Sequence, residues 1–281
     1  MRENTPSMTA WRSAVRRAAH QLWDDPIVFR DPLALKIVGD EEEAALRRTD
    51  ARSASTLEHT IRAIMVARSR VAEDALDEAL ARGVRQYVVM GAGLDTSPYR
   101  TAAQGLRVFE IDHPATQAWK KSQLAQTGIA VPDSVSFVPV DFARQTLAET
   151  LPPAGWDARQ PTFFSWLGVT SYLTREAVLG TLGFVAACPP GSEIVFDVST
   201  PASQVSLYER LARAAVALRI ALSGEPNGTR FDPSALAAEL RARGFGRVET
   251  LSGRQINARY FAARADKLKV SNRSALIRAA V

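Results

Sequence analysis

Residues 87–100, Tyr-Val-Val-Met-Gly-Ala-Gly-Leu-Asp-Thr-Ser-Pro-Tyr-Arg, decide the fold of this chain. The run Tyr87–Met90 is short, continuous and apolar, which is typical of a strand buried on both faces of a parallel sheet. Gly91 and Gly93 end the run, and glycine allows the backbone to turn tightly and to approach a ligand closely. A bare Gly-x-Gly is a weak signal, since a tight turn without a ligand has the same pattern.

A helix is expected directly after this turn. Ser97 fits the N-cap position, and Pro98 fits the first helical position. The free N–H groups and partial positive charge of a helix N-terminus favour anionic or nucleotide-like ligands. The stretch therefore predicts strand, glycine turn and helix, in the order that nucleotide-binding α/β folds use.

The rest of the chain alternates short apolar runs with helical patterns, which predicts a doubly wound α/β sheet. Strands are expected at 87–90, 107–111, 135–140, 162–166 and 193–198, followed by an antiparallel hairpin of 248–251 and 259–263. Helices are expected at 9–23, 32–39, 57–82, 114–127, 174–187, 203–222 and 232–244, the last capped by Asp232, and 40–55 reads as loop or loose helix. The hairpin assignment follows from its short connection, because parallel strands need a long crossover.

Domain organisation follows from the same pattern. Residues 1–83 are expected to form an N-terminal helical cap that is integral to the fold, since no linker-like composition separates them from the first strand. Residues 84–265 form the predicted core, with a helical lid insertion at about 203–230. The tail, 266–281, has no clear assignment.

Composition narrows the functional classes. With 281 residues and 46% hydrophobic content, the chain can bury a sizeable core. The net charge of +5 is dispersed and without interleaved aromatics, so nucleic acid is not indicated. The single cysteine, Cys188, excludes an internal disulfide and a cysteine-rich zinc site, and no metal is expected. Neither a membrane span nor a signal peptide is recognised, which predicts a soluble cytoplasmic protein, either monomer or homodimer, without membrane partners.

Carboxylates follow the second and third predicted strands. Asp112 lies about twenty residues beyond the second glycine, the spacing at which an acid reaches ribose hydroxyls. Asp141 follows the third strand, where its carboxylate can accept from an adenine amino group while Phe142 packs on the base. Each acid could instead cap the next element, but strand ends of a parallel sheet share one edge, and ligands bind there.

Two cofactor classes fit these features: nicotinamide dinucleotides and S-adenosylmethionine. The dinucleotide fingerprint requires a third glycine three residues after the second, and Thr96 stands there instead. The antiparallel hairpin also favours a methyltransferase sheet. S-Adenosylmethionine is therefore the expected cofactor, and a nicotinamide-dependent oxidoreductase remains the alternative.

Several motifs together resemble the leucine carboxyl methyltransferase superfamily, in its bacterial branch of S-adenosylmethionine-dependent methyltransferases. The resemblance covers residues 10–264 and is carried by Asp31-Pro32-Leu33-Ala34, Ala67-Arg68-Ser69-Arg70, Gly91-Ala92-Gly93-Leu94-Asp95-Thr96, Glu110-Ile111-Asp112-His113-Pro114, Val140-Asp141-Phe142, Gly168-Val169-Thr170-Ser171-Tyr172-Leu173 and Phe196-Asp197.

This resemblance implies a class I methyltransferase fold, a doubly wound seven-stranded sheet with an antiparallel C-terminal hairpin and an N-terminal helical cap. It implies that Arg68 holds the methionyl carboxylate of the cofactor, and that Gly91, Gly93 and Asp95 lie against its methionine part. It further implies that Asp112 binds the ribose and that Asp141 and Phe142 flank the adenine.

The chain departs from the family pattern at two positions. Leu167 replaces a glutamate that many members carry before the Gly-Val-Thr segment. Ser97 replaces an arginine that often follows the Leu-Asp-Thr motif. These changes affect details of the pocket, not the cofactor class.

Methyl transfer from a sulfonium is an in-line displacement, so such an enzyme contributes mainly positioning and a dry pocket. A carboxylate acceptor needs no general base, whereas a hydroxyl requires one. Tyr172 and His20 are the candidate catalytic residues; His59, also in the N-terminal helices, is another candidate for contact with the substrate, and His113 reads as structural. The expected function is O-methylation of a small-molecule carboxylate, such as a secondary metabolite. Methylation of a hydroxyl, nitrogen or carbon, of a protein C-terminus, and cofactor binding without turnover remain alternatives.

Overall fold

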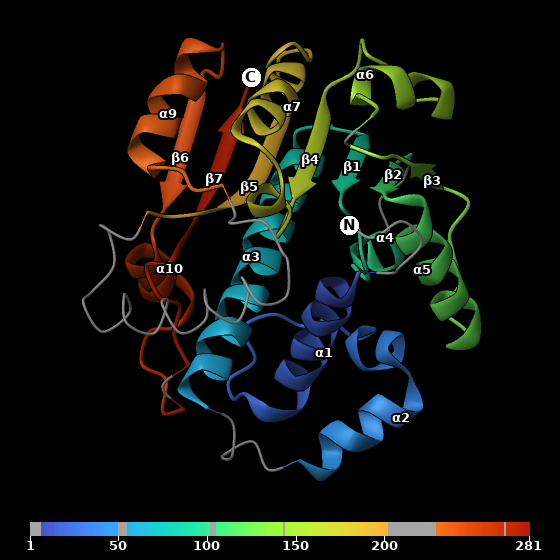
Figure 1. Cartoon of the computed structure of the whole chain (residues 1–281), viewed down its shortest axis with the longest axis vertical. Helices are drawn as coiled ribbons and strands as arrows, with labels where there is room; N and C mark the ends of the chain where they lie inside the picture. The colour runs from blue at the N-terminus through green and yellow to red at the C-terminus, as the bar shows by residue number, and fades with distance from the viewer. Residues whose placement is uncertain (1–6, 50–54, 102–104, 143, 202–228, 267) are drawn as a thin grey trace.

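A single seven-stranded sheet, ordered β3-β2-β1-β4-β5-β7-β6, runs through the molecule (Figure 1). The computed structural model describes residues 7–49, 55–101, 105–142, 144–201, 229–266 and 268–281. The strands are β1 (Gln86–Met90), β2 (Arg107–Asp112), β3 (Val135–Pro139), β4 (Thr162–Trp166), β5 (Glu193–Ser199), β6 (Arg247–Leu251) and β7 (Ser274–Ala280). The expected α/β class and seven-stranded sheet are confirmed.

β1 lies at the centre of the parallel part of the sheet. It pairs with β2 on one side and with β4 on the other, and all five of its residues are buried. The register sets Met90 opposite Ile111, so the two strands end together and the turn after β1 adjoins the end of β2. The apolar run of the central strand thus places the glycine turn at the carboxyl edge of the sheet.

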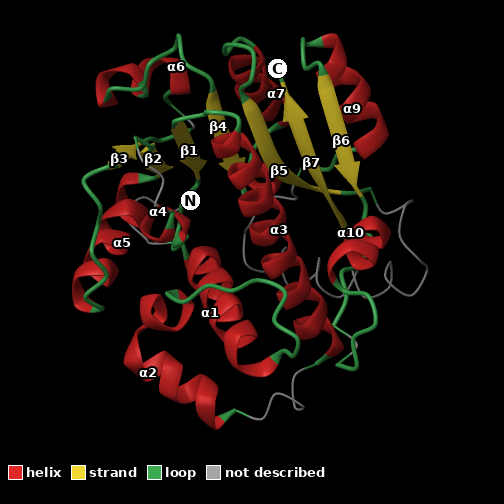
Figure 2. Ribbon diagram, turned by 180° about the vertical axis from the view of Figure 1, so that it is seen from behind, coloured by secondary structure: helices red, strands yellow, loops and turns green. Residues whose placement is uncertain are grey.

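Helices cover both faces of this sheet (Figures 1 and 2). The helices are α1 (Met8–Trp23), α2 (Ala34–Arg48), α3 (Thr56–Ala81), α4 (Ser97–Arg100), α5 (Pro114–Gln126), α6 (Leu147–Thr150), α7 (Arg175–Ala186), α9 (Pro233–Ala242) and α10 (Gly253–Tyr260). One apolar cluster joins the sheet to α6, α7 and α9, and a second joins its other face to α3 and α10. Figure 2 shows α3 crossing that second face.

The N-terminal helices pack beyond the ends of the parallel strands. A third apolar cluster joins α1 and α2 to α5 and includes Leu94 of the glycine turn. Trp11 of α1 and Trp119 of α5 add an aromatic pair with ring centroids 6.0 Å apart. In Figure 1 the two blue helices lie below the arrowheads of β1 and β4. This arrangement brings side chains of α1 to the carboxyl edge of the sheet.

The second helix is longer than the sequence predicts. The backbone at Gly39 has a φ of 82°, which marks a kink, but the helix continues to Arg48. Glycine tolerates this left-handed conformation and reads in sequence as a helix end. Of the stretch 40–55, which was expected to be loop or loose helix, the residues up to Arg48 are therefore helical.

The predicted closing hairpin is wrong in its second strand. The run Arg259–Ala263 does not form a strand, because α10 occupies 253–260. Its cause is a capping box: Ser252 accepts from the N–H of Gln255, and the Gln255 side chain accepts from the N–H of Ser252. The antiparallel partner of β6 is instead β7, which also pairs antiparallel with β5.

β7 lies in the tail that carries no assignment from sequence. A charged residue, Arg278, interrupts the apolar run of this strand, so the sequence does not have the pattern of a buried strand. In the structure Arg278 is buried between Glu193 of β5 and Glu78 of α3, with which it forms ion pairs. A buried charge must be paired, and both partners of this arginine come from other elements of the fold. The sequence of the tail alone therefore does not indicate an inner strand.

The predicted lid insertion falls largely on 202–228, outside the described residues. At its end, Arg230 forms an isolated parallel bridge with Ser199. Across the described ranges, no helix has both the length and the apolar character that a membrane crossing requires.

The position of β7 predicts a strong effect of core truncation in the tail. Leu276 is fully buried, so Leu276→Ala should lower the free energy of unfolding by about 2–5 kcal/mol, measured by urea denaturation. The control Leu57→Ala, at a side chain exposed in α3, should change it by less than about 0.5 kcal/mol. An effect of Leu276→Ala as small as the control's would contradict the inner position of β7.

Candidate functional site

The glycine turn after β1 interlocks with the loop after β4. Gly91 has a φ of 67°, and a Cβ there would lie 2.3 Å from Cγ2 of Val169. Gly93, with a φ of 45°, faces Ala10 of α1, where a Cβ would lie 3.0 Å from the alanine Cβ. Both glycines are therefore required by packing, and they hold the turn's backbone against two neighbouring elements.

The helix after the turn is only one turn long. Thr96, not Ser97, takes the N-cap position of α4, so the expectation for Ser97 is wrong. The Oδ1 atom of Asp95 accepts from the N–H of Ser97 at 2.9 Å, which satisfies one free donor of the helix start. Although burial opposes it, the positive charges of Arg17 and Lys120 lower the pKa of Asp95. Asp95 is thus an ionised side chain within the turn.

Asp31 joins the cap to the turn, and the sequence assigned it no role. Its carboxylate is fully buried and accepts from Thr96 Oγ1 at 2.7 Å. It also forms ion pairs with Arg100 (Nε–Oδ1, 3.1 Å) and with Arg17 (Nε–Oδ2, 3.5 Å). Thr96, which stands where a dinucleotide fold has its third glycine, therefore serves as a donor to the cap.

Asp112 lies at the end of β2, directly against the glycine turn. Its Oδ2 accepts from the N–H of Gly93 at 2.6 Å, and its Oδ1 accepts from the N–H of His113 at 2.7 Å. Burial raises the pKa of Asp112, and these two backbone donors oppose the rise. A carboxylate has about four acceptor positions, so it can still accept from hydroxyl groups of a ligand.

Asp141 and Phe142 follow β3 at the same edge. The N–H of Val140 donates to the carbonyl of Asp112 at 2.9 Å, which fixes the two strand ends side by side. Asp141 is about one-third exposed and forms an ion pair with Arg144 (3.6 Å). Phe142 is partly buried against the core cluster under α6 and α7. The structure thus brings Asp112 and Asp141 to neighbouring strand ends.

Arg68 reaches this edge from the middle of α3. Its side chain is 12% exposed, and its Nη1 lies 3.8 Å from Oδ2 of Asp197. Its guanidinium donates no hydrogen bond to any of the described residues, so its N–H groups are available to a ligand. The pKa of Arg68 is lowered, mainly by burial and also by the nearby Arg17. Asp197, Tyr172 and Asp95 raise this pKa but do not outweigh the burial.

The loop after β4 is held to the end of β5 by Asp197. The N–H of Gly168 donates to Oδ1 of Asp197 at 2.5 Å, and Thr170 Oγ1 donates to its carbonyl at 2.6 Å. Thr170 begins the 3₁₀ turn Thr170–Tyr172, and Tyr172 is 48% exposed. A Cβ at Gly168 would lie 2.5 Å from Nη1 of Arg68, so glycine lets the guanidinium lie against this loop.

The histidines have structural surroundings. His20 is fully buried; its Nδ1 lies 2.7 Å from Asp24, and its Nε2 accepts from the N–H groups of Val28 and Phe29. These bonds occupy both ring nitrogens, so the arrangement does not support the predicted catalytic role of His20. His113 caps α5 by accepting from Ala115 N–H at 3.3 Å. His59 lies nine residues before Arg68 on α3, about 13 Å along the helix axis.

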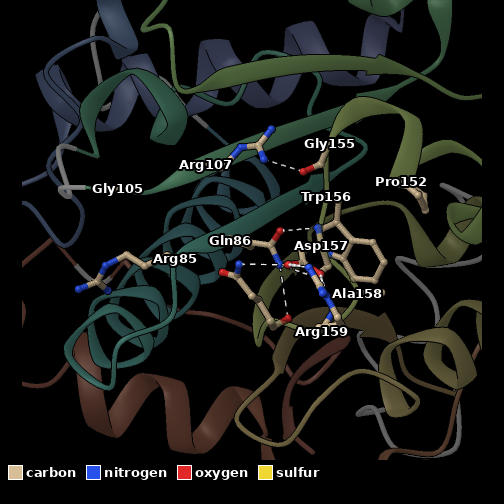
Figure 3. A pocket seen from close by; sticks show the side chains of 11 residues that line it. Arg85, Gln86, Gly105, Arg107, Pro152, Gly155, Trp156, Asp157, Ala158 and Arg159 are labelled. Atoms are coloured by element: carbon tan, nitrogen blue, oxygen red, sulfur yellow. Dashed lines mark hydrogen bonds and ion pairs between the residues drawn. The ribbon is translucent and has the colours of Figure 1, made fainter.

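Two cavities of the described structure lie away from the glycine turn. One, of about 630 Å³, is lined by the amino ends of β1 and β2 through Gln86 and Arg107 (Figure 3). Gln86 donates there to the carbonyl of Asp157, and Arg107 to the carbonyl of Gly155. Another, of about 560 Å³, lies between the starts of α9 and α10 and the end of β5 at Thr200. In the part of the chain that the structure describes, no group of acids, histidines or cysteines could hold a metal ion.

The sheet order, with antiparallel β7 between β5 and β6, defines a class I methyltransferase fold. A putative methyltransferase from Thermobifida fusca has a similar structure, with a TM-score of 0.56, 16% identity, and coverage of 99% of this chain and 96% of that one. A DUF574 family protein from Streptomyces avermitilis gives a TM-score of 0.55, 18% identity and 96% coverage of both chains.

Sequence comparison identifies the family within this fold. Residues 10–186 match the family model of leucine carboxyl methyltransferase. The chain is 32% identical to "Putative S-adenosyl-L-methionine-dependent methyltransferase YktD" of Bacillus subtilis, across 95% of each protein. The chain belongs to the leucine carboxyl methyltransferase family, and it is an S-adenosylmethionine-dependent methyltransferase. The resemblance stated from the sequence motifs is confirmed, and the oxidoreductase alternative is set aside.

Three contributors to the site carry no role in the sequence prediction: Asp31, Arg17 and Asp197. Asp31 and Asp197 stand in motifs that carry the family resemblance, but a motif does not show which side chain a carboxylate meets. Arg17 is one of three arginines on the amphipathic helix α1. Its burial and its bond from Nη2 to the carbonyl of Leu94 (2.6 Å) appear only when α1 packs on the turn.

A second acidic partner of Arg100, Glu73, leads to a prediction about pH. Glu73 of α3 forms a bidentate ion pair with Arg100, yet burial raises the pKa of Glu73 to about 7 from 4.5. A folded state that binds this proton more tightly than the unfolded chain loses stability as pH rises from about 4.5 to about 7. Between about pH 5 and pH 8, the unfolding free energy should fall by about 1–3 kcal/mol more for the wild type than for Glu73→Gln, measured by urea denaturation. Parallel pH profiles of the two proteins would contradict this assignment.

Proposed function

We propose that the carboxyl edge of β1, β2 and β3 holds S-adenosylmethionine and that the protein methylates a carboxylate of a small molecule. The residues there fit the cofactor's parts. Gly91 and Gly93 shape the turn whose backbone would lie against the methionine part. Asp112 offers acceptors for ribose hydroxyls, and Asp141 with Phe142 would flank the base. Asp95 would face the amino end of the methionine part.

The available guanidinium of Arg68 carries this proposal. A nearly buried arginine without hydrogen bonds in the described structure, with Arg17 beside it, favours an anionic ligand. A carboxylate is such a ligand, because guanidinium binds it through paired, charge-assisted hydrogen bonds. Arg68 would therefore bind the methionyl carboxylate.

When bound, the cofactor supplies a methyl group on a positively charged sulfur, which is already activated for displacement. The chain's own contribution is to orient the two reactants and to exclude water. Val169 packs against the glycine turn, and Tyr172, which is exposed on the loop after β4, would contact the acceptor. A secondary metabolite with a carboxyl group is the acceptor class that we propose.

The histidine surroundings support a carboxylate acceptor. A carboxylate is ionised at neutral pH and needs no base, whereas a hydroxyl acceptor must lose a proton. His20 and His113 are engaged in structural hydrogen bonds, and His59 is remote from Arg68 along α3. Tyr172 remains the candidate for acceptor contact, and methylation of a hydroxyl, nitrogen or carbon is the alternative reaction.

A soluble cytoplasmic monomer or homodimer remains our prediction for the protein's location and oligomeric state.

Substitution of Arg68 should weaken the binding of one cofactor analogue much more than that of another. In calorimetry, Arg68→Gln should weaken binding of S-adenosylhomocysteine by about 10- to 100-fold, because one charge-assisted contact is lost. Binding of methylthioadenosine, which lacks the amino-acid carboxylate, should change less than about threefold. The matched control is Arg70→Gln, two residues along the same helix, whose exposed side chain pairs with Asp74. Equal weakening of both ligands by Arg68→Gln would contradict the assignment.

The acceptor proposal predicts an ester product. The enzyme should transfer label from methyl-labelled S-adenosylmethionine to members of a panel of small carboxylic acids, and not to the matched alcohols. Mild alkali should release that label as methanol. Tyr172→Phe should lower kcat by less than about tenfold, since loss of a general base costs about 10²- to 10⁴-fold. A base-stable product, or a larger loss with Tyr172→Phe, would favour the alternative reaction.

A further inference from the structure

The carboxylate of Asp197 contacts both halves of the proposed site. It lies at the end of β5, and its two oxygens face different elements: Oδ1 accepts from the N–H of Gly168, and Oδ2 faces Arg68. The same residue's carbonyl accepts from Thr170. One residue therefore joins α3, which carries the cofactor-side arginine, to the loop that carries Tyr172.

The two side-chain contacts differ in kind. The contact to Gly168 is a hydrogen bond from the backbone N–H, which holds the loop's backbone. The 3.8 Å separation from Arg68 lies beyond hydrogen-bond range, so the attraction is electrostatic and leaves the guanidinium donors for another carboxylate. Side-chain exposures of 12% for Arg68 and 15% for Asp197 reduce solvent screening of this attraction.

The surroundings of Arg68 make this compensation necessary. Arg17 lies close enough to lower the pKa of Arg68, so two cations share one edge. Asp31 and the carbonyl of Leu94 engage Arg17, whereas Asp197 is the carboxylate within ion-pair distance of Arg68 among the described residues. Asp197 therefore offsets the repulsion between Arg17 and Arg68 at the point where the guanidinium lies against Gly168.

We propose that Asp197 is a positioning residue that couples the cofactor's amino-acid end, through Arg68, to the acceptor side, through Gly168 and the turn Thr170–Tyr172. This inference rests on the proposed function of the same edge. It assigns Asp197 no contact with either reactant. Occupation of the cofactor site should order the loop after β4, because both contacts share one carboxylate.

The test compares two ligands on the full chain. By calorimetry, Asp197→Ala should weaken S-adenosylhomocysteine at least tenfold while changing methylthioadenosine less than about threefold. Asp197→Asn keeps an oxygen for the Gly168 N–H and should retain the loop, with an intermediate loss of affinity. The control Asp157→Ala, at the opposite edge of the sheet, should leave both affinities unchanged.

Hydrogen exchange supplies a readout that a purely structural role would not move. S-Adenosylhomocysteine should slow exchange in peptides covering 168–173 of the wild type and of Asp197→Asn, but not of Asp197→Ala. Equal weakening of both ligands, unchanged affinity in Asp197→Ala, or ligand protection of 168–173 in that variant would each overturn the coupling. If the wild type itself binds neither ligand, the proposed function fails instead, so the two failures are distinguishable.

Discussion

The site depends on the hydrogen bond and ion pairs of one fully buried carboxylate, that of Asp31. A charge without solvent exposure is tolerated only when several donors compensate it, and here Thr96, Arg100 and Arg17 do so. These partners come from the glycine turn, from α4 and from α1. One charge network therefore joins α1 and the segment before α2 to the glycine turn, and removal of one partner would leave the buried carboxylate less well compensated.

From this network the chemistry of the edge follows in layers. Asp112 accepts from the turn's backbone at Gly93, so the carboxylate and the turn position each other. Arg68 lies against Gly168 from the other side, with donors that the described structure leaves available. This edge of the sheet thus offers carboxylate oxygens and a guanidinium, the two kinds of group that our proposal uses to bind the ribose and the methionyl carboxylate of S-adenosylmethionine.

Much of the fold could be predicted because its signals are local. The apolar run of β1, the helix caps at Thr174 and Asp232, and the alternation of strands and helices are read within windows of about ten residues. The prediction was wrong where a local signal competed with a distant one. The run 259–263 was predicted to be a strand, whereas the capping box at Ser252 starts a helix that continues to Tyr260.

By itself, the sequence determined the five parallel strands, the glycine turn, and the positions of Asp112 and Asp141 after the second and third strands, because the apolar runs and turn residues that mark a strand are local signals. It also carried the motifs that identify the family. Only the tertiary structure decided that β7 is an inner strand, since the burial of Arg278 requires Glu193 from another strand. Likewise, the pairings of Asp31 and Asp197 join residues far apart in the chain, and such contacts exist only once helices and sheet have packed.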